Sequence, residues 1–193
     1  MEMPVLETGR LVIRPFTLDD LDDIHRILDI ELADAEFGSE GAMTRSARQD
    51  WLVWCVSNYR QLVALFQPPY GDRAVTLKAS GVLIGAVGFV PSFGPFGQLP
   101  SLGGRPSRNT PEFGLYYAIS PAFQHQGHAY EAVQAMVAYA FATLHVERLV
   151  ATTTYDNLAS MAVMRKLGMC VEQNPSADPP WFQVVGILEN RLV

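Results

Sequence analysis

The sequence contains few cysteines, no long apolar run and no basic stretch at its N-terminus. Its two cysteines, Cys55 and Cys170, lie far apart among apolar neighbours, which is typical of buried free thiols in a reducing compartment. No apolar run approaches the roughly 20 residues that span a bilayer, and the N-terminus lacks the features of a signal peptide. We therefore expect a cytoplasmic protein with no membrane partner.

Positive charge is also scarce in this chain. Lysine and arginine number 14 against 20 aspartates and glutamates, so the formal net charge is −6. Nucleic acids are polyanions that this charge would repel, so we expect no nucleic-acid partner, whereas a cationic substrate is compatible with it. The length of 193 residues suits one domain, and a hydrophobic content of 49% supplies a full core. We predict a single domain over residues 1–193.

Hydrophobic periodicity predicts strands and helices that do not alternate strictly. Helices are predicted at residues 17–28, 46–66, 127–144 and 158–167. Strands are predicted at residues 11–15, 73–79, 82–90, 112–119, 148–154 and 181–188, with another at Val171. Thr17 with Asp20, and Ser46 with Gln49, are the predicted capping boxes of the first two helices. This order favours an α+β fold in which helices cover both faces of a mixed sheet.

The segment Pro91–Pro111 is dense in glycine and proline. A structureless loop of about 20 residues is uncommon inside a compact domain, and is usually a functional lid or a disordered excursion. Phe93, Phe96 and Arg105 are candidates for contact with a substrate if the segment is a lid. A variable surface insertion is the equal alternative.

The most informative stretch joins the predicted strand that ends at Ile119 to the helix that opens at Gly127. The first backbone N–H groups of a helix are unpaired and lie at the positive end of its dipole. A glycine there lets the backbone approach a pyrophosphate with no side chain in the way. The stretch therefore predicts an anion site, although a glycine near a helix start is often only part of a cap.

Within this stretch, Gln124-x-x-Gly127-x-Ala129 resembles the Gln/Arg-x-x-Gly-x-Gly/Ala signature of GNAT acetyltransferases. Residues 6–16, 84–88 and 157–169 also resemble the family and fall in its order. Together these stretches span most of the chain, from residue 6 to residue 169, and look most like the RimJ/RimL-like branch of ribosomal-protein N-terminal acetyltransferases. The resemblance implies the GNAT fold, a mixed and mostly antiparallel sheet of about seven strands, splayed at its centre.

The resemblance further implies acetyl-coenzyme A (acetyl-CoA) as co-substrate. Backbone amides of the loop would hold the pyrophosphate, the end of the preceding strand would bind the pantetheine arm and the thioester oxygen, and Asn157 would bind the arm. The implied coenzyme-binding residues are Tyr117, Ala118, Ile119, Gln124, His125, Gln126, Gly127, His128, Ala129, Asn157 and Ser160. We expect no metal, because His125 and His128 have no third ligand near them in sequence.

Ser160 and Glu112 are the candidates for catalysis. Many family members carry a tyrosine at the position of Met164, so Ser160 is the implied proton donor to the leaving thiolate. The alternative is an ordinary serine in the first turn of a helix. Glu112 matches an acid common on the acceptor strand, where it would accept the proton of the amine or hold a cation; an exposed strand-end residue is the equal alternative. No third carboxylate stands out.

The resemblance thus implies direct transfer of an acetyl group to a primary amine, which is either a protein N-terminus or a small molecule. A non-catalytic acyl-CoA-binding sensor or scaffold of the same fold is the alternative, since the usual tyrosine is missing. A monomer and a homodimer are both compatible with the sequence.

Overall fold

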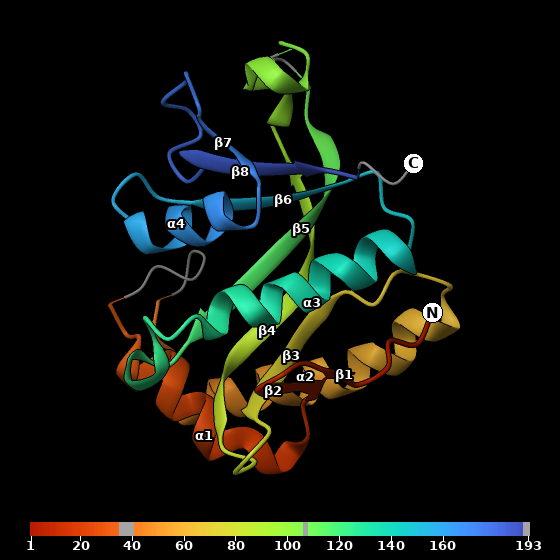
Figure 1. The fold of residues 1–193 in the computed structure, drawn as a ribbon, viewed down its shortest axis with the longest axis vertical. Helices are drawn as coiled ribbons and strands as arrows, with labels where there is room; N and C mark the ends of the chain where they lie inside the picture. Colours follow the sequence, from red (N-terminus) through yellow and green to blue (C-terminus); the bar gives the residue numbers. More distant parts are fainter. Residues whose placement is uncertain (35–40, 106–107, 191–193) are drawn as a thin grey trace. The chain divides into compact units, whose positions relative to one another are not determined.

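The computed structural model describes residues 1–34, 41–105 and 108–190. In these ranges the strands are β1 (Leu6–Glu7), β2 (Leu11–Pro15), β3 (Gly71–Leu77), β4 (Leu83–Gly94), β5 (Thr110–Ile119), β6 (Arg148–Thr153), β7 (Cys170–Gln173) and β8 (Val184–Glu189). They form an eight-stranded sheet of order β1-β2-β3-β4-β5-β6-β8-β7 (Figure 1). β5 and β6 are parallel, whereas β1–β2, β2–β3, β3–β4, β6–β8 and β7–β8 are antiparallel. The predicted mixed, mostly antiparallel sheet is confirmed, with β1 as an additional short strand.

Helices accompany these strands and confirm the α+β class. They are α1 (Leu21–His25), α2 (Arg45–Ala64), α3 (His128–Ala142) and α4 (Leu158–Lys166). Shorter 3-10 or π-helical segments are η1 (Leu18–Asp20), η2 (Arg26–Glu31), η3 (Phe96–Gln98), η4 (Pro100–Leu102) and η5 (Pro121–Phe123).

The chain divides into two compact units, which are described separately. Unit 1 comprises Met1–Phe89 and Tyr116–Met136, and unit 2 comprises Val90–Leu115 and Val137–Val193. β4, β5 and α3 each run from one unit into the other. The single domain and the central splay of the sheet stay predictions.

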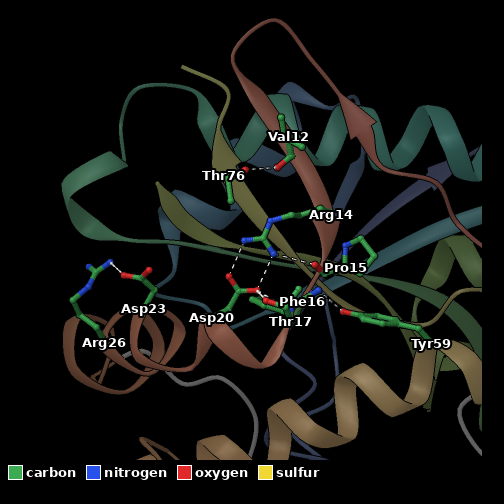
Figure 2. Close-up of polar contacts among 10 residues, drawn as sticks. All are labelled: Val12, Arg14, Pro15, Phe16, Thr17, Asp20, Asp23, Arg26, Tyr59 and Thr76. Atoms are coloured by element: carbon green, nitrogen blue, oxygen red, sulfur yellow. Dashed lines mark hydrogen bonds and ion pairs between the residues drawn. The ribbon is translucent and has the colours of Figure 1, made fainter. Parts of the chain in front are cut away.

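In unit 1, a capping box holds the turn from β2 towards α1. The Thr17 N–H donates to Asp20 Oδ2 at 2.8 Å, as the spacing of these two residues predicts. Figure 2 shows the guanidinium of Arg14 on both carboxylate oxygens of Asp20, at 2.8 and 2.7 Å. Burial alone would raise the pKa of Asp20, but these hydrogen bonds outweigh burial and lower that pKa. The box fixes the point at which the chain leaves the sheet.

Helix α2 is capped by Thr44 and not by Ser46. The Thr44 backbone is extended, and its hydroxyl accepts a hydrogen bond from the Ala47 N–H at 3.3 Å. Ser46 already lies in the first turn, where the backbone is helical. The predicted cap at Ser46 is therefore wrong by two residues.

The core of unit 1 forms where α1, η2 and α2 pack on one face of the sheet. Strand side chains that alternate along β3, β4 and β5 supply this face, because successive residues point to opposite sides. The cluster comprises Phe16, Ile24, Ile27, Leu28, Leu52, Ala74, Leu83, Ala86 and Ala118, with Leu21, Leu32, Trp51 and Tyr116 packed against it. The small alanines on the strands leave room for the larger helix side chains.

The segment expected to be a structureless loop instead contributes to the core of unit 2. β4 continues to Gly94, and η3 and η4 follow it. Phe96 is 1% exposed and Leu99 is 0% exposed, and the ring of Phe96 meets that of Phe182 edge to face at 5.0 Å. Because Phe96 and Leu99 are core residues, the loop prediction is wrong for the part of the segment that the structure describes. Residues 106 and 107 lie outside the described residues.

Polar contacts fix the same segment to the C-terminal part of unit 2. The Gln98 side chain donates to the Asp178 carbonyl at 3.1 Å and accepts from Asn174 Nδ2 at 2.9 Å. Phe93, by contrast, is 67% exposed. Two aromatic residues that the sequence analysis grouped together therefore have different roles. In the described residues, the structure contains no helix that is both long and apolar enough to cross a membrane.

Candidate functional site

The predicted anion site lies in unit 1, in the turn between β5 and α3. η5 uses the amides of Phe123 and Gln124 in its own turn. His125 and Gly127 have φ angles of +57° and +81°, the left-handed region that favours glycine. Within the described part of the chain, no group accepts a hydrogen bond from the amides of residues 125–129. The turn thus presents successive unpaired N–H groups at the start of a 15-residue helix, an arrangement suited to binding phosphate.

Side chains of the predicted motif shape this turn. Gln124 Nε2 donates to the carbonyl of Ile119, the last residue of β5, at 2.8 Å. Gln126 Nε2 donates to the carbonyl four residues before it at 3.2 Å, and His128 Nδ1 donates to the Phe123 carbonyl at 3.1 Å. With these side chains engaged in the turn, it is the backbone amides that are left for a ligand.

Arg10 anchors the turn to the N-terminal part of unit 1, a role that the sequence analysis missed. Arg10 Nη1 donates to the Gln126 carbonyl at 2.9 Å, and Arg10 Nε donates to Glu131 Oε2 at 2.6 Å. The Thr8 hydroxyl and the Arg10 N–H donate to the other Glu131 oxygen at 2.6 and 2.8 Å. Burial would raise the pKa of Glu131, but these bonds outweigh burial and lower it. Thr8 and Arg10, which lie outside the turn, thereby stabilise its conformation.

Positive side chains beside the turn are already neutralised. Arg10 and Lys78 both line a depression of about 400 Å³ that also includes His128. Arg10 forms an ion pair with Glu131 at 2.6 Å, and Lys78 forms one with Glu7 at 2.7 Å. The attraction of this turn for an anion therefore comes mainly from backbone dipoles.

The end of β5 carries the residues predicted to bind the pantetheine arm. Ala118 and Ile119 are 4% and 5% exposed, so any contribution they make comes from the backbone. The Ser120 N–H donates to the Ile84 carbonyl at 2.8 Å, which holds this end against β4. The Ser120 hydroxyl is fully buried and has no hydrogen-bond partner among the described residues. It is a polar group next to the turn that the sequence analysis did not single out.

In unit 2, Asn157 and Ser160 meet in the first turn of α4. Asn157 caps the helix, with its Oδ1 accepting from the Ser160 N–H at 2.9 Å. Asn157 is exposed and Ser160 is half-buried. Met164 is fully buried, and its Sδ lies 2.9 Å from the place of a Cβ on Gly186. Position 164 therefore faces the core, and the methionine there has no proton to donate.

Glu112 is buried at the start of β5, not exposed at a strand end. Its Oε2 accepts from Arg148 Nε at 2.7 Å, and its Oε1 accepts from Arg148 Nη2 at 3.0 Å. Thr110 Oγ1 also donates to Oε1, at 3.3 Å. These bonds from Glu112 raise the pKa of the Arg148 guanidinium. Sequence reasoning missed Arg148 as a partner because it lies 36 residues away.

A further carboxylate, Asp72, lies at the start of β3 in unit 1. It is half-buried, and loss of water around its carboxyl raises its pKa to about 6 against the opposing charge of Arg48. No local motif marks this residue in the sequence.

Burial, followed by the charge of Asp72, raises the pKa of Cys55, which makes its thiol a poor nucleophile. Cys170 is exposed, and both cysteines are free. Among residues 1–34, 41–105 and 108–190, no three His, Cys, Asp or Glu side chains gather into a metal-binding group.

Comparisons with known proteins identify the family of this chain. A family model described as "Acetyltransferase (GNAT) domain" matches residues 10–170. The chain is 33% identical over 103 residues to YnaD, an uncharacterized N-acetyltransferase of Bacillus subtilis (strain 168), a match that covers 51% of this chain and 52% of YnaD. It is 27% identical over 166 residues to YoaA, an uncharacterized N-acetyltransferase of the same organism, covering 86% of this chain and 82% of YoaA.

Solved structures extend the likeness to the whole fold. The ribosomal-protein-S5-alanine acetyltransferase from Vibrio fischeri is 16% identical, with a TM-score of 0.68 and coverage of 98% of each chain. At this identity the likeness concerns the fold alone, and it includes a member of the expected RimJ/RimL-like group. Because the family model covers most of its length, the chain belongs to the GNAT family of acetyltransferases.

Proposed function

We propose that this protein transfers the acetyl group of acetyl-CoA directly to a primary amine. The observation that carries the proposal is the run of unpaired amides at residues 125–129, at the start of α3. A pyrophosphate accepts hydrogen bonds from such amides and benefits from the helix dipole. Gly127 leaves the approach open, because a Cβ there would meet nothing closer than Arg10 Nη2 at 3.5 Å.

Further roles are proposed for the end of β5 and for the first turn of α4. The backbone of Tyr117, Ala118 and Ile119 would bind the pantetheine amides as an added strand does, and an N–H there would stabilise the oxyanion of the thioester carbonyl. In unit 2, the Nδ2 of the exposed cap Asn157 would bind the arm. Ser160 would donate a proton to the departing thiolate.

Direct transfer without a covalent enzyme intermediate fits the state of the cysteines. The thiol of Cys55 is buried with a raised pKa, and neither cysteine belongs to the turn or to the first turn of α4. Glu112 is a candidate for the base that accepts the proton of the amine. Its two hydrogen bonds from Arg148 favour a structural role over that of a base, because the ion pair would have to open before a substrate could use the carboxylate.

The acceptor is a protein N-terminus or a small-molecule amine. The Vibrio fischeri neighbour is named for a ribosomal-protein alanine, which makes peptides with a free N-terminus one class to test. We place the enzyme in the cytoplasm, where acetyl-CoA is available. Thiol release from acetyl-CoA with serine- and alanine-initiated peptides and with small amines tests the activity. Tight coenzyme binding with no acceptor-dependent release would identify the sensor alternative instead.

The coenzyme site is tested by Gly127→Glu, which puts bulk and negative charge where the pyrophosphate would bind. We expect calorimetry to show acetyl-CoA affinity weakened by at least about 100-fold. The matched control is Gly81→Glu, because Gly81 also has a positive φ, of +73° against +81°, with open space around it. Both variants carry the same backbone strain and the same added charge. Equal affinity in the two variants would remove the turn from the coenzyme site.

A further inference from the structure

Asp72 lies on the sheet face that forms the core of unit 1. It precedes Ala74 by two residues on β3, so the two side chains share a face. Ala74 and Ala86 are both members of the core cluster on that face. Asp72 pairs across the sheet with Gly88, which follows Ala86 by two residues on β4. The carboxylate is therefore next to Gly88 at the margin of this core.

Gly88 provides the space that the Asp72 side chain occupies. A Cβ at position 88 would lie 2.8 Å from Asp72 Oδ1, 2.8 Å from Asp72 Cα and 2.5 Å from the Gly71 carbonyl oxygen. Such contacts are too close for any side chain, so only glycine at position 88 lets the carboxylate take this position.

Groups of α2 and β5 interact with Asp72 through its backbone or through its charge. Figure 2 shows the hydroxyl of Tyr59, on α2, directed towards Phe16. This hydroxyl accepts a hydrogen bond from the Phe16 N–H at 3.1 Å and donates one to the Asp72 carbonyl. Tyr116 of β5 packs against the same core, and its pKa is raised by burial and then by the negative charge of Asp72. Burial, then the Asp72 charge, likewise raises the pKa of Cys55.

Arg48, the cation whose charge acts on this carboxylate, is bound to another acid. Arg48 donates to both oxygens of Asp29, from Nε and Nη2 at 2.8 Å each, and the Asp29 side chain is 1% exposed. The Met43 N–H and His25 Nδ1 also bond to Asp29, at 2.8 and 2.9 Å. Arg48 therefore lowers the pKa of Asp72 only in part, and that pKa stays near 6.

Within the described ranges, Asp72 has no ion-pair partner and no hydrogen bond to its carboxylate oxygens. A partly desolvated carboxylate without a partner in the fold marks a candidate ligand site, because a ligand can supply the missing partner. The complement of a lone carboxylate is a cation with N–H donors, as in a protonated amine. Tyr116 is followed directly by Tyr117 and Ala118, the residues proposed to hold the thioester.

We propose that Asp72 binds the ammonium group of the acceptor and removes its proton; this inference rests on the acetyltransferase function proposed above. The ammonium transfers one proton to the carboxylate, giving a neutral amine and a carboxylic acid. The amine nitrogen then forms a bond to the thioester carbonyl carbon, and the carbon–sulfur bond breaks with its electron pair on sulfur. The second proton of the nitrogen ends on the thiolate, and Asp72 returns its proton to solvent.

The experiment compares Asp72→Asn with the parent, using the most active amine among tripeptides that begin with serine or alanine, spermidine and tyramine. For the parent, kcat/KM rises with pH through about 6, because only the ionised carboxylate binds and deprotonates the amine. For Asp72→Asn, we expect kcat/KM to fall at least about tenfold and this rise to disappear. The Kd for acetyl-CoA should stay within about twofold, since the turn at residues 125–129 is untouched.

Two controls make the result specific. Asp50→Asn removes the same charge from an exposed position on α2, and should leave kcat/KM and its pH profile unchanged. Glu112→Gln tests the rival carboxylate and should keep the rise near pH 6. Asp72→Asn is isosteric and removes an unpaired charge, so it should melt no lower than the parent at pH 8. Asp72→Glu provides a second folded variant, which should retain part of the activity.

The outcomes are distinct. An active parent whose Asp72→Asn variant keeps both kcat/KM and the rise near pH 6 would overturn the assignment while leaving the acetyltransferase function intact. Loss of the rise in Glu112→Gln alone would move the role to Glu112. A parent that binds acetyl-CoA but releases no thiol with any amine would overturn the proposed function and this inference with it.

Discussion

Glu112 in unit 2 and Asp72 in unit 1 are both strand carboxylates, and their surroundings differ in the availability of a cation. Arg148 donates to both oxygens of Glu112, whereas Arg48, whose charge acts on Asp72, donates to both oxygens of Asp29. Burial therefore has opposite consequences at the two positions. It strengthens an existing ion pair at Glu112, and it leaves Asp72 with a pKa near 6 and an unused acceptor.

A similar contrast separates the amides of residues 125–129 in unit 1 from the side chains of Asn174 and Asn157 in unit 2. In unit 1, the amides of residues 125–129 have no acceptor among the described residues. In unit 2, Asn174 Nδ2 donates to Gln98 Oε1 and to the Phe182 carbonyl, both at 2.9 Å, and Asn157 accepts from Ser160. Polar groups that the fold has satisfied act in stability, and those that it has left unsatisfied are the groups available to ligands.

The largest expected effect comes from removing core packing in unit 2 with Phe96→Ala. Phe96 is 1% exposed and stacks edge to face on Phe182, so we expect a loss of about 3–5 kcal/mol in the free energy of unfolding. Urea denaturation measures it. Phe93→Ala is the matched control, since that side chain is 67% exposed and should change stability by no more than about 0.5 kcal/mol.

This pair of variants also separates a core segment from a substrate lid. At a temperature where Phe96→Ala stays folded, its Kd for acetyl-CoA should match that of the parent within about twofold, because the turn lies in unit 1. Equal stability of the two variants would contradict the assignment of residues 96–102 to the core.

Replacing each carboxylate by the corresponding neutral amide should have a smaller effect on the free energy of unfolding. The sign of this effect should be opposite at Glu112 and Asp72. Glu112→Gln loses the charge that Arg148 binds and should lower the free energy of unfolding by about 1–3 kcal/mol at pH 7.5. Asp72→Asn should raise it at that pH. The folded pKa of Asp72 lies above the value of 3.8 for an unperturbed carboxyl, so its protonation stabilises the fold fully below that value, and this contribution is lost as pH rises through about 6.

Urea denaturation at pH 7.5 and at pH 4 measures both changes. The gain in Asp72→Asn should shrink towards zero at the lower pH, where the carboxyl of the folded parent is already protonated. A variant that is destabilised at pH 7.5 would mean that Asp72 has a partner in the fold, and the contrast with Glu112 would then fail.

Structural features encoded by residues close together in the sequence could be predicted. Features that depend on contacts between distant residues could not. The turn before α3 and the Thr17–Asp20 box are each encoded within a few residues, so their spacing sufficed. The ion pair of Glu112 joins residues 36 apart, and the position of Asp72 depends on its register with Gly88 and on Arg48 being bound to Asp29. Glycine and proline around residues 91–111 indicated a loop, because composition alone does not show that Phe96 and Leu99 find core partners across unit 2.

The smallest expected effect concerns Ser160, a polar residue of unit 2 that belongs to a satisfied cap and is also a proposed catalytic group. In Ser160→Ala the cap survives, because the bond to Asn157 Oδ1 comes from the backbone N–H of residue 160, at 2.9 Å. The substitution therefore removes only the hydroxyl. If that hydroxyl protonates the departing thiolate, the acetyl-transfer rate should fall by about three- to tenfold, or roughly 1 kcal/mol in activation free energy.

Single-turnover thiol release measures this rate without interference from product dissociation, and calorimetry should give an unchanged Kd for acetyl-CoA. Asn157→Ala is the informative contrast, since it removes the cap and should lower the free energy of unfolding by about 1 kcal/mol. A Ser160→Ala variant with the full single-turnover rate would assign Ser160 to the helix alone. Met164 is buried against Gly186 and has no proton to offer, so the thiolate would then have to leave unprotonated or take its proton from water.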